Sequence, residues 1–498
     1  MSKTGVDAAV LPRHQHCSGG TGMTSTGNDI IETLTAIVGP AHVLTGTDTD
    51  RFARDWTGTW VGAPCAVVRP ANTAEVAACV TAAVKTDIAI VPVAGNTGLA
   101  GGTHAPGALM ISVERMNRII EIRPEARIAV VEAGVVLSHL HEAASAHDLC
   151  FPLTFGARGS AMIGGNLSTN AGGSNVLRYG NTRGLCLGLE VVLASGKVLD
   201  LMSELHKDNS GYDLKDLFIG AEGTLGLITR AVVKLVPQPK AFATAMVATS
   251  SLDAALTLLN RLQEATGGAV EACEYMPQSY IDALLEMFPK MRAPFDTPRA
   301  VNILVEVGAT AARDVAVNDD GSVPVVENLQ QTLADLMQEG LVLDATVARS
   351  SAERTEMWAR REAAADVTLT RGPTLINDIC VPLDKVSTFL TLSQARVDAL
   401  APGAECLVVS HLGDGNVHYT VRPEALPPAL KNALMEAIED VVAELGGSFS
   451  AEHGIGLAKL PSMARRKNGV ALEVMRAIKT ALDPEGRMNP GKVLPAQT

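Results

Sequence analysis

The sequence predicts an α+β protein with more than one domain. Its 498 residues are enough for roughly three domains with large buried cores. Short apolar runs typical of strands, at 65–70 and 88–93, flank a run over 72–86 whose apolar residues recur at helical spacing. The alternation of such runs continues along the chain without an internal repeat. This pattern indicates a mixture of helices and sheets throughout.

The first predicted domain covers residues 29–239. Residues 1–28 are polar, rich in glycine, serine and threonine, and lack an apolar stretch, so we expect a disordered leader and not a signal peptide. A helix is expected to start from a cap at Asn72 or Thr73. Many β-rich runs follow, and the domain ends at a proline-containing stretch near 237–239.

The second predicted domain covers residues 240–445. Helical runs, such as 251–265 and 326–340, alternate with strand-like runs, such as 301–307 and 404–421. We expect an α+β unit in which helices pack on one face of a sheet. A largely helical C-terminal segment, residues 446–498, follows this domain.

Composition limits the class of protein. The net charge is -13 and no run of lysine or arginine could follow a phosphate backbone, so we expect no nucleic-acid partner. The eight cysteines include no Cys-x-x-Cys pair, which fits a reducing compartment, and we expect a cytoplasmic protein. No stretch approaches the roughly 18 consecutive apolar residues of a transmembrane helix.

Two glycine-rich segments indicate a site for a large cofactor. The first, residues 91–104, follows a predicted strand, and the second, residues 156–184, contains eight glycines among serines, threonines and asparagines. Glycine lets backbone N–H groups approach an anion closely. The first segment matches neither the dinucleotide-binding nor the P-loop pattern, and a plain flexible turn is the alternative for it. The second is followed by a buried-strand sequence, which a surface linker would not be, and together the two favour a long, phosphate-bearing cofactor.

A predicted hairpin over residues 408–421 carries two histidines. Asp414-Gly415 lies between two apolar runs and is a strong signal for a two-residue turn. In that register His411 faces His418 across the ladder, with Cβ atoms about 5 Å apart on one face. The pair could hold one ion. The alternative is a solvated hairpin tip.

Six segments in one order resemble the FAD-dependent 2-hydroxyacid dehydrogenases of the vanillyl-alcohol oxidase superfamily, and among them most closely the D-2-hydroxyglutarate dehydrogenases. The resemblance runs from about residue 50 to the C-terminus and rests on residues 92–102, 164–173, 207–229, 411–418, 450–459 and 482–495. It implies a two-subdomain FAD-binding domain of the vanillyl-alcohol oxidase (PCMH) type, an α+β substrate or cap domain, and a C-terminal segment that packs back on the FAD site.

The resemblance also implies which residues bind FAD. It assigns the pyrophosphate to the first glycine-rich loop, the phosphate and flavin side to the second, the adenosine end to a later loop, and one further contact to the C-terminal segment. These residues are, in that order, Gly95, Asn96, Thr97, Gly98 and Leu99; Ser160, Gly164, Asn166 and Thr169; Glu222, Gly223 and Ile228; and Asn489. The family binds FAD non-covalently, so we expect that His104 does not form a covalent bond with the flavin.

A third metal ligand is expected in the segment 450–459. Glu452, with His411 and His418, leaves an open coordination position, as in a catalytic divalent metal site, and imidazole ligands favour Zn²⁺. The resemblance assigns the same three ligands and makes His453 the base that removes the hydroxyl proton while the C2 hydride passes to flavin N5. The alternative is a polar strand end before a glycine turn.

Arg361 is implied to bind the substrate carboxylate, a task that suits its planar guanidinium. Arg360 or a solvated helix face is the alternative. The chain departs from the D-2-hydroxyglutarate dehydrogenase pattern at Ala365, Ile376 and Thr420, where that pattern has threonine, lysine and asparagine. We therefore expect this chain to lack polar contacts that those enzymes make with their substrate at these positions.

The expected function is the oxidation of a D-2-hydroxy acid to the 2-oxo acid. Electrons are expected to pass to an electron-transfer flavoprotein or a quinone, and a homodimer is a possible state. A D-lactate or glycolate dehydrogenase flavin subunit is the alternative among enzymes. A flavin-binding redox component without turnover is the alternative of another class.

Overall fold

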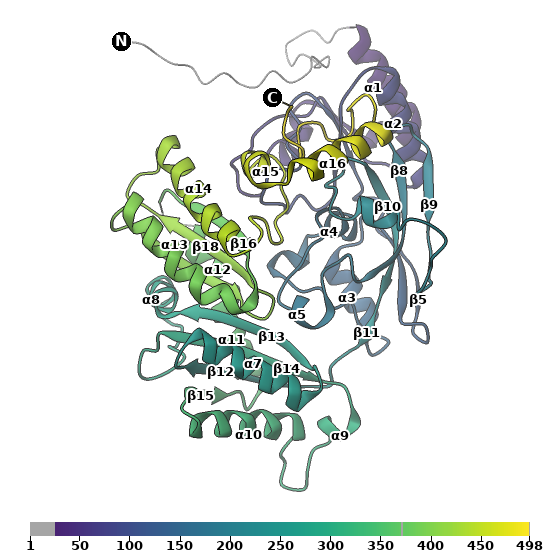
Figure 1. Ribbon diagram of the computed structural model, residues 1–498. Helices are drawn as coiled ribbons and strands as arrows, with labels where there is room; N and C mark the ends of the chain where they lie inside the picture. The colour runs from purple at the N-terminus through teal and green to yellow at the C-terminus, as the bar shows by residue number, and fades with distance from the viewer. Residues whose placement is uncertain (1–24, 370–371, 498) are drawn as a thin grey trace, which may run out of the picture.

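The computed structural model describes residues 25–369 and 372–497. Figure 1 shows an N-terminal domain in purple and blue, a second domain in green, and a yellow C-terminal segment that lies against the N-terminal domain. The predicted leader lies outside the described residues, except for its last four, which begin helix α1 (Ser25–Val38). Within the described ranges, no helix combines the length and the apolar character needed to cross a bilayer.

The N-terminal domain contains two larger sheets and a two-stranded sheet formed by β7 and β11. Its strands are β1 (Val43–Leu44), β2 (Ala66–Val68), β3 (Ile90–Val93), β4 (Leu109–Ser112), β5 (Ile119–Arg123), β6 (Ile128–Glu132), β7 (Leu149–Cys150), β8 (Cys186–Leu193), β9 (Val198–Leu201), β10 (Gly226–Lys234) and β11 (Val236–Pro237). One sheet has the order β1-β2-β4-β3, and the other, antiparallel, has the order β5-β6-β10-β8-β9. These are the two subdomains that the sequence predicts.

Helices cover these two sheets and share one apolar core with them. They are α1, α2 (Thr73–Lys85), α3 (Leu137–Ser145), α4 (Ile163–Thr169), α5 (Val176–Tyr179) and α6 (Lys215–Phe218), with short 3-10 turns at Pro40–His42, Gly46–Phe52 and Gly156–Gly159. The side chain of Asn72 accepts a hydrogen bond from the amide of Glu75, so Asn72 is the cap of α2. Fully buried residues from both sheets form a single cluster.

The second domain is built on one antiparallel sheet of seven strands. The strands are β12 (Ala241–Thr249), β13 (Val270–Pro277), β14 (Val301–Ala309), β15 (Val342–Val347), β16 (Leu375–Cys380), β17 (Glu405–His411) and β18 (Asn416–Arg422). Their order is β15-β12-β14-β13-β17-β18-β16. The helices are α7 (Leu252–Thr266), α8 (Gln278–Met287), α9 (Ala312–Val315), α10 (Pro324–Gln338), α11 (Ser351–Glu362), α12 (Ala364–Leu369), α13 (Val386–Leu400) and α14 (Pro428–Glu444), with a 3-10 turn at Leu383–Lys385.

Helices lie on both faces of this sheet, so the prediction of helices on one face is wrong. Apolar residues of α7, α10, α13 and α14 pack with one set of strand residues, whereas α8, α11 and α12 pack with the alternate set. Strand side chains alternate between faces. The sequence pattern gives the apolar stripe of each helix but not the face of the sheet that the stripe meets.

The hairpin that carries the two histidines has a longer connection than predicted. His411 lies opposite Asn416 and His418 lies opposite Val409, so the ladder is shifted by two positions and four residues connect the strands. The carbonyl of His411 accepts hydrogen bonds from the amides of Asp414 and Gly415. Because the shift is even, both histidines still lie on one face of the sheet.

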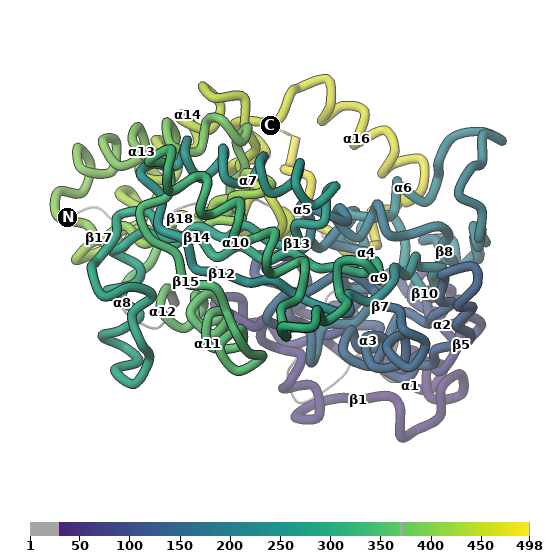
Figure 2. The backbone as a smooth tube through the Cα atoms, turned by 90° about the horizontal axis from the view of Figure 1, so that it is seen from below, coloured from purple at the N-terminus to yellow at the C-terminus, as the bar shows by residue number. Residues whose placement is uncertain are grey.

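The C-terminal segment returns to the N-terminal domain. It contains helices α15 (Leu460–Arg466) and α16 (Gly469–Leu482). Beyond α16, Met488 forms a bridge with Ile90 of β3, and the amide of Asn489 donates to the carbonyl of Ile90 at 2.7 Å. Figure 2 shows the yellow helix α16 along an edge of the N-terminal domain. The segment thus packs against the N-terminal domain.

Candidate functional site

A cleft of about 2440 Å³ is lined by residues of both domains and of the C-terminal segment. Twelve of the thirteen residues predicted to bind FAD line this cleft: Gly95, Asn96, Thr97, Gly98, Leu99, Ser160, Gly164, Asn166, Thr169, Glu222, Gly223 and Ile228. Asn489 is buried nearby, and its side-chain amide donates to the carbonyls of Gly102 and Glu222. The two glycine-rich segments therefore meet in one cavity.

The glycine-rich wall has the properties that a long polar cofactor needs. A Cβ atom on Gly95 would lie 2.2 Å from the carbonyl oxygen of Ser160, so the two segments touch only because residue 95 is glycine. A Cβ atom on Gly98 would meet nothing within 4 Å. Among the described residues, the buried Nδ2 of Asn166 has no hydrogen-bond partner. Open space and an unsatisfied donor fit an acceptor-rich group such as FAD.

Glu222 links the N-terminal domain to the loop that carries His453. Its two carboxylate oxygens accept hydrogen bonds from the amides of Ile455 and Gly456, at 2.6 and 2.8 Å. Burial raises the pKa of this carboxyl, although the two amides oppose the shift. Glu222 adopts a positive φ of 51°. Its carboxylate thus orders the loop after residue 453, and its predicted place at the adenosine end of FAD remains a prediction.

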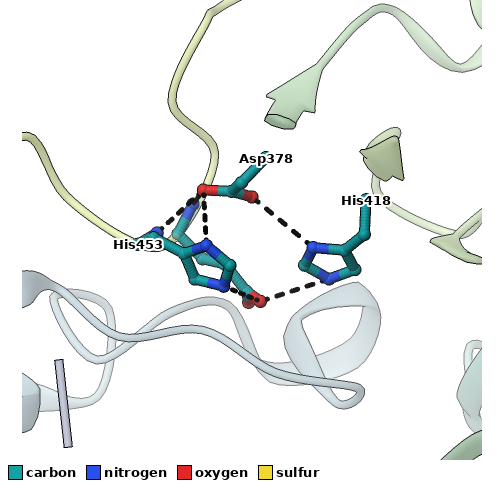
Figure 3. A group of neighbouring side chains, drawn as sticks. Asp378, His418 and His453 are labelled. Carbon is teal, nitrogen blue, oxygen red and sulfur yellow. Dashed lines mark hydrogen bonds and ion pairs between the residues drawn. The ribbon is translucent and has the colours of Figure 1, made fainter. Parts of the chain in front are cut away.

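Asp378, His418, Glu452 and His453 form a group that could hold a metal ion, since one ligand atom of each lies within 4.8 Å of the others. Oε1 of Glu452 is 3.4 Å from Nε2 of His418 and 3.5 Å from Nε2 of His453. The two imidazole rings are stacked with centroids 5.4 Å apart. Figure 3 shows the side chains of His418 and His453 turned toward the carboxylate of Asp378.

The pKa shifts of His418 and Glu452 favour the protonation states that bind metals, whereas the shift of His453 favours its protonated form. Burial lowers the pKa of His418 to about 4. Burial alone would raise the pKa of Glu452, but His453 and His418 outweigh it and bring that pKa to about 2. Burial would lower the pKa of His453, yet Asp378 and Glu452 raise it. Neutral imidazole and ionised carboxylate are the forms that bind cations such as Zn²⁺.

Asp378 is a member of this group that the sequence did not point to. It is 1% exposed, and its Oδ2 accepts hydrogen bonds from the amides of Glu452 and His453 and from Nζ of Lys459. Burial would raise its pKa, but His453 and Lys459 hold the pKa well below the usual range. An acidic residue within a strand, β16, whose remaining residues are apolar apart from Asn377 and Cys380, is the signal in the sequence.

His411, the remaining predicted ligand, lies beside the group. Its ring centroid is 5.5 Å from that of His418. Its Nδ1 is 2.8 Å from Oε1 of Glu274, and its Nε2 is 3.3 Å from Nη2 of Arg361. The four residues closest together therefore include Asp378 and His453 in place of His411, and the assignment of His411 as a ligand remains a prediction.

Arg361, and not Arg360, lines the cleft. The Arg361 side chain is 11% exposed, and its Nε donates to Oε2 of Glu274 at 2.7 Å. Arg360 is buried on the other side of α11, where it donates to the carbonyl of Arg292 and to Glu356. Ala365, Ile376 and Thr420 also line the cleft.

Comparison with known proteins identifies the family. Residues 64–202 match the FAD binding domain model, and residues 238–493 match the model of the FAD linked oxidases, C-terminal domain. The chain is 34% identical to the D-2-hydroxyglutarate dehydrogenase of Stutzerimonas stutzeri (strain A1501), over 94% of this chain and 99% of that protein. The chain belongs to the FAD-linked oxidase family. The mitochondrial D-2-hydroxyglutarate dehydrogenase of Rattus norvegicus is another relative, 35% identical over 89% of this chain and 80% of its own length.

Solved structures agree with the fold of this FAD-linked oxidase. p-Cresol methylhydroxylase with substrate bound has a TM-score of 0.71 at 16% identity, over 95% of this chain and 97% of its own. The 4-ethylphenol oxidase of Gulosibacter chungangensis has a TM-score of 0.69 at 19% identity, over 95% and 99%. The α+β fold with a PCMH-type FAD-binding domain is thus confirmed. The sequence relatives and the matching family models show that the chain is an FAD-dependent oxidoreductase of the 2-hydroxyacid dehydrogenase class.

Proposed function

We propose that the chain oxidises a D-2-hydroxy acid to the 2-oxo acid in a reaction that needs FAD and a divalent cation, with Zn²⁺ the best match. One observation carries the proposal: a group of donors that could hold a metal ion, which includes His453, and an arginine lie in the cleft that also contains the glycine-rich segments. These are the groups required to bind a carboxylate, activate a hydroxyl and take up its proton.

Each side chain has a separate task in this proposal. Arg361 binds the substrate carboxylate through its guanidinium. His418 and Glu452, with His411, hold the cation, which supplies Lewis-acid polarisation of the substrate hydroxyl when bound. His453 takes the hydroxyl proton at Nε2, the nitrogen on the Glu452 side, while its Nδ1 faces Asp378. The glycine-rich segments would hold FAD, and N5 of the flavin would supply the acceptor for the C2 hydride.

The substrate side chain is expected to be short or apolar. Ile376 lies directly opposite Thr420 in the ladder, and the next pair on the same face is Asp378 with His418. Next to Asp378 and His418, the wall of the cleft thus presents the apolar side chain of Ile376 and the hydroxyl of Thr420. The relatives named D-2-hydroxyglutarate dehydrogenase support the hydroxyacid class, and Ile376 favours D-lactate-like substrates within it.

Anaerobic mixing of the holoprotein with a panel of 2-hydroxy acids tests the reaction. D-2-hydroxyglutarate, D-lactate, glycolate and D-2-hydroxybutyrate are compared by the rate at which the flavin absorbance bleaches. Bleaching with at least one D-acid is expected. Loss of bleaching after metal removal, with the flavin absorbance retained, would support the cation requirement. An oxidised flavin with every acid would favour a redox component without turnover.

Two further parts of the proposal concern the cofactor and the acceptor. FAD should leave the protein on acid denaturation, because we propose no covalent link, and flavin in the precipitate would contradict this.

We propose an electron-transfer flavoprotein or a quinone as the acceptor. Turnover with a quinone analogue or with a purified electron-transfer flavoprotein distinguishes the two. The mass in solution tests the homodimer.

A further inference from the structure

Glu274 is a buried carboxylate that connects two parts of the candidate site. It lies on β13, is 1% exposed, and lines the cleft. Its Oε1 is 2.8 Å from Nδ1 of His411 and its Oε2 is 2.7 Å from Nε of Arg361. A buried charge is costly unless it is paired. Both oxygens of this one are used, one on each partner.

The arrangement follows from the topology of the second domain. Residue 274 lies directly opposite residue 411 where β13 pairs with β17, and this is the junction between the two halves of the sheet. Arg361 is at the C-terminal end of α11, on the face of the sheet to which Glu274 and His411 point. Three elements distant in sequence therefore meet at a single carboxylate.

The neighbours of His411 define its tautomer. The guanidinium of Arg361 can only donate hydrogen bonds, and its Nη2 is 3.3 Å from Nε2 of His411. In the neutral ring Nε2 must then be the acceptor, so Nδ1 carries the proton and donates it to Glu274. This leaves the Nε2 lone pair as the only ligand atom of the ring.

We propose that Glu274 is a positioning residue that orients both His411, a proposed metal ligand, and Arg361, the residue proposed to bind the substrate carboxylate. It fixes His411 in the tautomer whose Nε2 carries a lone pair, which accepts from Arg361 in this structure, and it fixes the orientation of the guanidinium of Arg361. A carboxylate behind a ligating histidine is a general means of orienting the ring. This proposal rests on the proposed function. It adds that one residue, Glu274, positions the side chains used for cation binding and for substrate binding.

The variant Glu274→Gln tests the proposal, because an amide has the same shape but cannot accept from both partners through two oxygens. The zinc affinity of the protein, measured by competition with a chromophoric chelator, is expected to fall about 10- to 100-fold. KM for the best 2-hydroxy acid is expected to rise, and the FAD content is expected to stay the same. Glu190→Gln is the matched control, since Glu190 is 4% exposed and paired with Arg230 in the N-terminal domain.

A second variant separates positioning from simple loss of structure. In an Arg361→Ala background, Glu274→Gln should no longer raise KM but should still weaken zinc binding, because only one of the two links remains. If Glu274→Gln does not fold, Glu274→Asp, which keeps the charge but is shorter, is measured in the same two assays.

The outcomes distinguish this proposal from the one on which it rests. A folded Glu274 variant with wild-type zinc affinity and wild-type KM overturns the role of Glu274 and leaves the proposed function intact. A wild-type protein that binds no zinc and reduces its flavin with no 2-hydroxy acid overturns the proposed function itself. A fall in zinc affinity equal to that of Glu190→Gln would show a general loss of stability, and would also overturn the proposal.

Discussion

His453 is the residue at which the proposed chemistry is tested most directly. His453→Ala removes the proposed proton acceptor but leaves Arg361 and the proposed metal ligands His411, His418 and Glu452 in place. We therefore expect flavin reduction to slow by roughly 10²-fold or more, with a smaller change in substrate binding. Stopped-flow reduction under anaerobic conditions gives both quantities. His147→Ala, at an exposed histidine after α3, is the control, and a change confined to KM would reassign His453 to binding.

Ile376 is expected to determine the preference for the substrate side chain. It is 45% exposed on β16 and lines the cleft. Ile376→Lys adds a cation to this wall, and a charge-assisted contact contributes about 1.5 to 3 kcal/mol. Relative kcat/KM for D-2-hydroxyglutarate over D-lactate should therefore increase roughly 10- to 150-fold. A wild-type protein that already prefers D-2-hydroxyglutarate by more than tenfold would contradict the assigned role of Ile376.

At the scale of secondary-structure elements, the connection of the β17–β18 hairpin depends on Gly415. Its φ is 81°, and a Cβ atom there would lie 2.1 Å from the carbonyl oxygen of Val381. Gly415→Ala is expected to destabilise the protein by on the order of 1 to 3 kcal/mol and to lower the metal content while FAD binding persists. Metal analysis and urea unfolding check this.

Gly403→Ala is the matched control for that substitution. Its φ is 79°, but a Cβ atom would meet nothing within 4 Å. It carries the strain of a positive φ without the collision, so only a modest loss of stability is expected. Equal effects of the two substitutions would show that contact with Val381 is unimportant.

The hairpin also shows how far the sequence alone leads. The Asp-Gly signal correctly predicts a hairpin with His411 and His418 on one face. The four-residue connection was not predictable, because it depends on Gly415 approaching Val381, a contact between strands that are separate in the sequence. Glu274 and Asp378 were missed for the same reason. Glu274 shares its strand with Glu271 and Asp378 follows Asn377, so neither strand strongly singles out these two acids, and their partners come from other elements.

At the scale of the whole molecule, Lys492 joins the C-terminal segment to the N-terminal domain. It is 7% exposed, and its Nζ donates to the carbonyls of His104 and Pro490. Burial lowers its pKa to about 8 from 10.5. The unfolded chain therefore holds this proton more tightly, and the free energy of unfolding should rise as pH increases from about 8 to 10.5.

Lys492→Met should lack this rise. The difference in unfolding free energy between wild type and Lys492→Met is expected to change by on the order of 3 kcal/mol over that interval. Urea unfolding at pH 7.5 and pH 10 measures it, and the comparison of the two proteins cancels the titration of all other groups. If the difference in unfolding free energy between the two proteins does not change with pH, the pKa of Lys492 is not lowered in the folded protein.

The return of the C-terminal segment also constrains the order of events during synthesis. The first glycine-rich loop follows Ile90, but Met488 and Asn489, which contact Ile90, Gly102 and Glu222, are translated about four hundred residues later. A domain can fold as it leaves the ribosome, yet the residues around the first glycine-rich loop lack these contacts until residues 488 and 489 have emerged. Nascent chains stalled before residue 488 should therefore retain FAD less well than released protein, so cofactor retention reports on complete synthesis.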